Sequence, residues 1–220
     1  SASANRPDNT NSGDLLVASL TFRLDVSGLS ITNPEGWELI SRTDQGSNLG
    51  LATYYKIANS TEPSSYSWGV YTSNNRWSLG ISRITGASAG TPITIFNESS
   101  SGSSSTSVEA PSINTIENNQ LVLSFFANGN AGSFTSPSGN TERYDNPYTG
   151  GSSGIRPSNM LATYIQINKG ATGNKIATSS SSAVWVAQQI AINSTLQNTQ
   201  YPVIEGTRTH VNNSETSSHT

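Results

Sequence analysis

The sequence predicts an all-β protein made of two related antiparallel β-sandwich domains in tandem, jelly-roll-like in their strand content. Apolar residues stand in short runs or alternate with polar residues, between clusters of Gly, Pro, Asn, Asp and Ser. No segment shows the periodicity of an amphipathic helix. Several segments recur in the same order in the second half. The 220 residues suffice for two domains of about 100 residues each.

The composition favours a folded protein outside the cell. Charged residues make up 11% of the chain, against about 25% in an average globular domain. A net charge of only -3, with 4 Trp, 8 Tyr and 5 Phe, argues against disorder. Because Ser, Thr and Asn replace Lys and Glu, we expect an extracellular or virion-surface location. We expect neither a nucleic-acid partner, since only 11 residues are Lys or Arg, nor membrane insertion, since no long apolar run exists.

The first half reads as a series of strands. The apolar run Leu15–Phe22 lies between turn signals and predicts a buried strand. Asn33–Gly36 predicts a turn, because Pro fixes φ and Gly tolerates positive φ, and Trp37–Ile40 follows as a strand. Leu49–Ile57 predicts another strand, rich in Tyr and aliphatic residues. The alternating segment Tyr66–Tyr71 predicts a strand with one buried face, and Trp77–Ser82 does the same.

The end of the second half is the one segment with an alternative. Ala183–Ile192 has a helix-like content of Ala and Gln. A strand is favoured because Val184, Val186, Ile190 and Ile192 share one face, with polar Gln188 as the exception.

The internal repeat fixes the domain organisation. Four pairs of segments match at a separation of roughly 105 residues. The first domain is predicted at 1–98, a Ser-rich linker or loop at 99–107, and the second domain at 108–196. Residues 197–220 are predicted to be the opening strand of a further repeat or a strand that pairs back on the first domain. The matched pairs begin at Asp14 and Gln120, Thr32 and Thr135, Leu51 and Leu161, and Trp77 and Trp185.

Six segments of the chain carry a resemblance to a known family. They are Gly13–Val17, Pro34–Ile40, Leu51–Ala58, Pro137–Tyr144, Ala171–Gly173 and Ser180–Ala187. Together they resemble repeated β-domains of tailed-phage virion structural proteins, which are also seen in some bacterial surface proteins. The resemblance covers about residues 13–192. Its motifs are turns, strand cores and a Trp, so it implies location and architecture, and it brings no catalytic residue.

The sequence offers little for catalysis. The two histidines, His210 and His219, lie near the end of the chain, and no Cys is present, so neither a Ser-His-Asp arrangement nor a metal site is expected. No phosphate-binding Gly-rich motif appears, and we expect no cofactor. A glycosidase would need two facing carboxylates, and this reading ranks lowest. The acids in comparable parts of the two halves are Glu35, Glu38, Glu142 and Asp145.

Aromatic side chains are the remaining candidates for ligand binding. Trp37, Trp77 and Trp185 read as core residues, because large aromatics dominate cores. Tyr148 reads as a ligand-binding residue, since it stands in a turn-rich segment with little reason to bury it, and Asn146 and Tyr144 complete this predicted site.

Three hypotheses for the function follow. The first is a non-catalytic component of a virion surface, namely a head decoration, a fibre or a tail-fibre segment, with structural and host-adhesion roles. Its expected partners are other virion or fibre subunits in a homo-oligomer, and host-surface glycans. The second is a secreted bacterial adhesin or carbohydrate-binding module, and the third is the glycan hydrolase.

Overall fold

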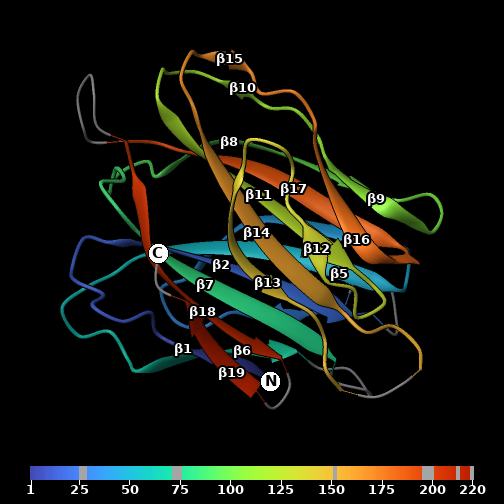
Figure 1. The fold of residues 1–220 in the computed structure, drawn as a ribbon. Helices are drawn as coiled ribbons and strands as arrows, with labels where there is room; N and C mark the ends of the chain where they lie inside the picture. The colour runs from blue at the N-terminus through green and yellow to red at the C-terminus, as the bar shows by residue number, and fades with distance from the viewer. Residues whose placement is uncertain (25–28, 71–75, 151–152, 195–200, 212–213, 219–220) are drawn as a thin grey trace.

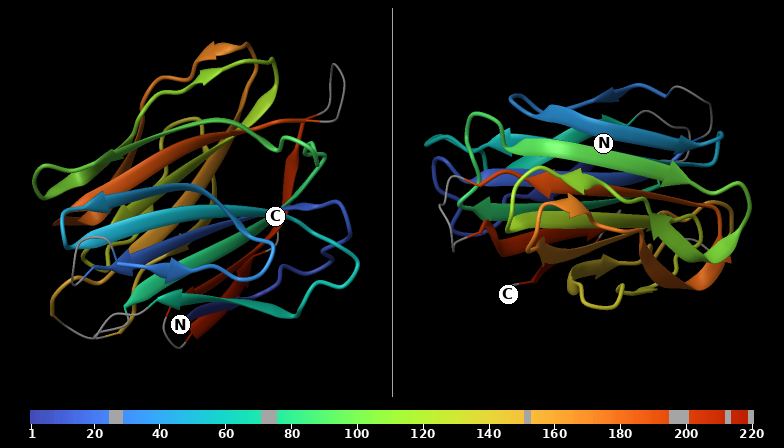
Figure 2. Two further views of the ribbon diagram at one scale, coloured as in Figure 1. Left: turned by 180° about the vertical axis from the view of Figure 1, so that it is seen from behind. Right: turned by 90° about the horizontal axis from the view of Figure 1, so that it is seen from above.

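The computed structural model describes residues 1–24, 29–70, 76–150, 153–194, 201–211 and 214–218. These residues form strands and turns, and the described part contains no helix. Two large antiparallel sheets pack face to face, and a three-stranded sheet covers the outer face of each (Figures 1 and 2). The predicted all-β class with packed antiparallel sheets is confirmed.

The first unit, as we name it, consists of a six-stranded sheet and a three-stranded covering sheet. The six-stranded sheet has the order β19-β18-β7-β2-β5-β4, and the covering sheet has the order β1-β6-β3. Its strands are β1 (Ala2–Asn5), β2 (Leu15–Arg23), β3 (Ile31–Thr32), β4 (Glu38–Gln45), β5 (Leu49–Ile57), β6 (Ser65–Val70), β7 (Trp77–Thr85), β18 (Val203–Val211) and β19 (Ser214–Ser218).

The second unit repeats this plan. Its five-stranded sheet has the order β13-β14-β11-β17-β8, its covering sheet the order β12-β16-β9, and a short pair β10-β15 lies beside them. Its strands are β8 (Ile93–Ser100), β9 (Ser105–Ala110), β10 (Asn114–Thr115), β11 (Gln120–Asn128), β12 (Phe134–Thr135), β13 (Thr141–Asn146), β14 (Ser158–Gln166), β15 (Gly170–Ala171), β16 (Lys175–Ala183) and β17 (Trp185–Ile192).

The central strands of both units are buried on both faces. In β2, Leu16 and Leu20 face the covering sheet, whereas Leu15 and Val17 face the second unit. A strand buried on both sides has no polar face, so its sequence is a continuous apolar run and not an alternation. This explains the run at 15–22 and its counterpart in β11.

A single core joins the two units. It contains Leu51 and Ile84 from the first unit with Leu123, Phe125 and Ile190 from the second, all essentially inaccessible to solvent. Burial of apolar surface of this kind stabilises a protein by roughly 25 cal/mol per Å². The two halves of the chain therefore share an interior.

The Ser-rich segment at 99–107 connects two strands of the second unit. Ser99 and Ser100 end β8, and β9 begins at Ser105. Between them, Ser101 is buried, and its backbone N–H donates to the Trp185 carbonyl at 2.9 Å. The predicted boundary at residue 98 falls within β8, which pairs with β17 in the second unit. The chain thus crosses between the units at residues 86–92.

The C-terminal segment lies on the first unit. β18 pairs with β7 along the register Val203–Thr85 to Val211–Ser78, one of the two arrangements expected for residues 197–220. β1 pairs with β6, the place that β9 takes beside β16 in the second unit. The first unit therefore has an opening strand before Gly13.

Candidate functional site

The three residues predicted to bind a ligand lie in the contact between the two units. Tyr144 is 6% exposed, and its hydroxyl group shares a hydrogen bond of 2.5 Å with Ser19 of β2. The Asn146 side chain donates to the Ser78 hydroxyl at 2.7 Å. These contacts explain their burial, since each polar group meets a partner across the interface.

Tyr148 was expected to be exposed, and this expectation is wrong, because the side chain is 7% exposed. The guanidinium of Arg76 lies 6.0 Å from its ring centroid, and the Tyr148 N–H donates to the Ser158 hydroxyl at 3.4 Å. The turn residues around Tyr148 correctly indicated an irregular segment, but this segment lies against the first unit. Burial leaves Tyr144, Asn146 and Tyr148 with packing roles, so the geometry does not support ligand binding at these positions.

A second pair of polar contacts crosses the same interface. Gln188, the polar exception on the inner face of β17, donates to the Thr43 hydroxyl at 3.0 Å and accepts from the Thr53 hydroxyl at 2.8 Å. Its side chain is fully buried. A buried amide with partners on both ends fixes the register of the two sheets, because any shift would leave these groups unpaired.

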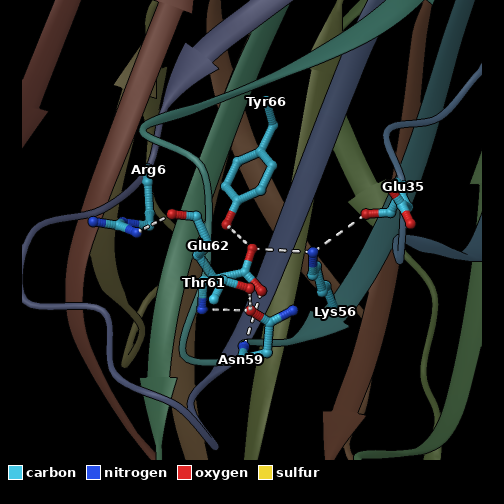
Figure 3. Close-up of polar contacts among 7 residues, drawn as sticks. All are labelled: Arg6, Glu35, Lys56, Asn59, Thr61, Glu62 and Tyr66. Carbon is cyan, nitrogen blue, oxygen red and sulfur yellow. Dashed lines mark hydrogen bonds and ion pairs between the residues drawn. The ribbon is translucent and has the colours of Figure 1, made fainter.

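The candidate functional site of the first unit is an ionic cluster that the sequence analysis did not single out (Figure 3). The Lys56 ammonium lies 3.0 Å from the Glu62 carboxylate, and the Tyr66 hydroxyl donates to the same carboxylate at 2.6 Å. The Glu62 side chain is only 1% exposed. Lys56 stands in an otherwise apolar strand, and this is the sequence signal that could have revealed the cluster.

Burial and hydrogen bonds act on the cluster in opposite directions. Burial tends to raise the pKa of Glu62, but hydrogen bonds from Tyr66, the Asn59 N–H and Lys56 outweigh it, so the pKa lies below its usual value. Burial and the hydrogen bond to Glu62 raise the pKa of Tyr66. The Glu62 side chain is therefore a carboxylate and the Tyr66 side chain a neutral phenol near pH 7.

A cavity of about 590 Å³ lies beside the cluster. Its walls carry the Lys56 side chain, an amide from Asn59, and hydroxyl groups from Thr61, Ser65 and Ser67. The aromatic ring at this cavity, Tyr66, is buried at 3% exposure and presents no open face for stacking. The cavity suits a small polar ligand held by hydrogen bonds.

Three of the four acids considered for hydrolysis accept hydrogen bonds from neighbouring groups of the protein. Glu38 accepts a hydrogen bond from the Tyr55 hydroxyl at 2.5 Å, and Glu142 accepts one from Ser136 at 3.2 Å. Asp145 accepts the Phe134 N–H at 2.9 Å, and burial raises the pKa of its carboxyl group to about 6. The Glu35 backbone carbonyl accepts from Lys56. The carboxylates of Glu38, Glu142 and Asp145 are thus each engaged in a hydrogen bond, and the charge of Glu142 adds to the raised pKa of Asp145.

The predicted core tryptophans lie in the cores. Trp37 and Trp77 are 3% and 4% exposed, and Trp185 is half-buried against the core of the second unit. His210 packs edge-on against Trp77 with 5.0 Å between ring centroids. Tyr71 and His219, named in the sequence analysis, lie outside the described residues.

Two further observations bear on the function. Within the described ranges, no group of three or more His, Cys, Asp or Glu side chains is placed to hold a metal ion, and no helix is long and apolar enough to cross a membrane. Comparison with protein-family models, curated proteins and solved structures finds no match for the chain.

Proposed function

We propose that the chain is a non-catalytic component of a virion surface, either a head decoration, a fibre or a tail-fibre segment, with structural and host-adhesion roles. The observation that supports this proposal is the core shared by the two units, with Leu51 and Ile84 packed against Leu123 and Phe125. Such a core suits a mechanical role, because a force that neighbouring subunits apply to one unit is resisted by the apolar contacts with the other.

The arrangement of the charged groups supports a role without catalysis. A glycosidase needs two carboxylates facing each other across the scissile bond. In this chain, the Glu62 carboxylate is paired with Lys56, and the Glu38 carboxylate accepts from Tyr55. Both acids are therefore engaged in contacts that stabilise the fold.

Cryo-electron microscopy of native particles tests the virion proposal. We expect the density of the four stacked sheets on the outside of a capsid or along a fibre. Density for this fold on a cell envelope, or attached to an enzyme domain, would contradict the proposal.

The alternative is a secreted bacterial adhesin or carbohydrate-binding module, and the polar cavity beside Lys56 supports it. Its hydroxyl and amide groups match the hydrogen-bonding pattern of sugar hydroxyls. A glycan array with the unmodified chain and with Ser65→Ala tests this candidate. Loss of a glycan signal in Ser65→Ala, with retention in the distant variant Ser153→Ala, would assign glycan binding to this cavity, and the microscopy then decides between a virion component and a secreted protein.

A further inference from the structure

The two units exchange their edge strands. β8 follows β7 in the sequence but pairs with β17 of the second unit, and β18 follows β17 but pairs with β7 of the first unit. In Figure 1 the red strand β18 accordingly lies beside the green-to-teal strand β7, which is far from it on the colour scale. The chain therefore closes on itself like a strand-swapped dimer whose two subunits have been joined.

The two exchanged strands are held differently within the chain. β8 leads directly into β9, which pairs with β16, so the chain stays in the second unit after β8. β18 is followed by β19, which pairs with β18 itself. Among the described residues, β19 therefore adds no pairing to the rest of the sheet, and β18 is held there by its contacts with β7.

The contacts of β18 are largely backbone pairing with polar support. Among residues 203–210, whose burial is described, the one large apolar side chain with almost complete burial is Ile204, at 1% exposure. The guanidinium of Arg208 lies 2.7 Å from the Asp8 carboxylate, and Glu205 lies 3.8 Å from Arg83. Docking by backbone hydrogen bonds with a few side-chain contacts is how proteins accept an added strand at a sheet edge.

We propose that the edge of β7 is a strand-acceptor site whose partner is the β18 strand of a second copy of this chain. The incoming strand makes the same pairs that β18 makes within its own chain, from Val203 opposite Thr85 onward. Exchange replaces contacts within one chain by the same contacts between two chains. The balance between the two forms therefore depends on the protein concentration relative to the effective concentration of the tethered strand. Reciprocal exchange gives a closed dimer, and one-way exchange gives a linear chain of copies.

Single-cysteine variants of the full chain test this proposal. Ser82 on β7 and Thr207 on β18 are directly opposite, and both are at most 3% exposed. Directly opposed residues in antiparallel strands lie close enough for a disulfide after a small adjustment. The chain has no native cysteine, so Ser82→Cys and Thr207→Cys in separate molecules form a bridged heterodimer only when β18 of one copy pairs with β7 of the other.

The two variants are mixed at high concentration, incubated under native conditions, oxidised and analysed by mass spectrometry without reduction. We expect the heterodimer at a level several-fold above a matched mixture of Ser99→Cys and Ala187→Cys, which are opposed in β8 and β17. The double variant Ser82→Cys/Thr207→Cys, expected to form an intramolecular bridge at low concentration, confirms that the geometry permits the bond. A bridge in the double variant with heterodimer no higher than in the matched mixture would overturn the proposal.

If the double variant forms no bridge, Thr85→Cys and Val203→Cys, which are opposed at the start of the same ladder, replace the first pair. A bridged heterodimer above the level of the matched mixture is again expected at high concentration. A bridge in the double variant Thr85→Cys/Val203→Cys without such a heterodimer would refute exchange.

Discussion

The two units contact each other at two equivalent places and fill them differently. The repeat matches Leu51 with Leu161, and the strand partners of these residues are Thr43 and Tyr144. Tyr144 packs over Gly80 of β7, where an added Cβ atom would lie 2.3 Å from the tyrosine ring. Thr43 contacts Gln188 of β17, the counterpart of Gly80.

This difference shows that the interface conserves the summed volume at each place and not the residue types. One place pairs the large side chain of Tyr144 with Gly80, which has no side chain. The other pairs Thr43 with Gln188, whose side chains are of middle size. Cores accept such exchanges when total volume is kept.

Filling the space at Gly80 should disrupt the interface most. Gly80→Val places a branched side chain against Tyr144, and we expect a loss of about 3 kcal/mol in the free energy of unfolding, typical of severe overpacking. Urea unfolding followed by Trp fluorescence measures the loss. The control is Gly206→Ala, because nothing lies within 4 Å of a Cβ atom at Gly206. Equal stabilities of the two variants would refute the volume argument.

Replacing Gln188 should have a smaller effect. Gln188→Met keeps the volume but leaves the Thr43 and Thr53 hydroxyl groups without the amide, and we expect a loss of about 2 kcal/mol. Thermal unfolding measures the loss. An unchanged melting temperature would show that the amide is not needed to hold the sheets in register.

Removing the Tyr144 hydroxyl group should cost less still. In Tyr144→Phe the ring that fills the space over Gly80 remains, and Ser19 keeps a hydrogen bond with the Asn159 side chain at 2.8 Å. We expect a loss of about 1 kcal/mol in the free energy of unfolding. A loss as large as that of Gly80→Val would mean that the hydroxyl group, and not the ring, holds the second place together.

The smallest expected effect is on the pH dependence of stability, through the carboxyl group of Asp145. Burial raises the pKa of its carboxyl group from 3.8 to about 6, so the folded protein binds this proton more tightly than the unfolded chain. Stability from this group is therefore full below about pH 4 and is lost as the pH rises through about 6. Asp145→Asn should flatten the pH dependence of the melting temperature between these values.

Glu62 in the first unit provides the comparison of opposite sign. Its pKa is lowered in the folded protein, so its contribution is present at neutral pH and is lost as the pH falls below the usual range of a carboxyl group. In Glu62→Gln the melting temperature should fall at pH 7 and change little at low pH. If the melting temperature of Glu62→Gln fell equally at pH 7 and at low pH, the ionised Glu62 carboxylate would not be the cause.

Local sequence patterns were sufficient to predict several of the strands. The apolar run at Leu15–Phe22 forms β2, which is buried on both faces. The alternation at Trp77–Ser82 forms β7, but the expected single buried face is wrong, because the second unit covers the small residues Ser78 and Gly80 as well. Within Ala183–Ile192, the segment Trp185–Ile192 was correctly assigned to a strand. Its polar exception, Gln188, could not be explained without knowing that a second sheet covers this face.

The strand partners and the predicted site could not be obtained in this way. Whether β8 joins β7 or β17 depends on contacts between distant residues, which leave no periodic trace in the sequence of β8. Tyr148 was misjudged because turn residues indicate an irregular backbone but not what packs against it. The Lys56 and Glu62 pair belongs to β5 and to the connection before β6, and its meeting depends on how that connection folds.

The central claim is that the two units form one body through a shared core and exchanged strands. Differential scanning calorimetry tests it most directly, by comparing the calorimetric enthalpy with the van't Hoff enthalpy. We predict a single transition with equal enthalpies, shifted as a whole to lower temperature in Gly80→Val. Two transitions, of which Gly80→Val shifts only one, would contradict the claim and show that the units are independent domains.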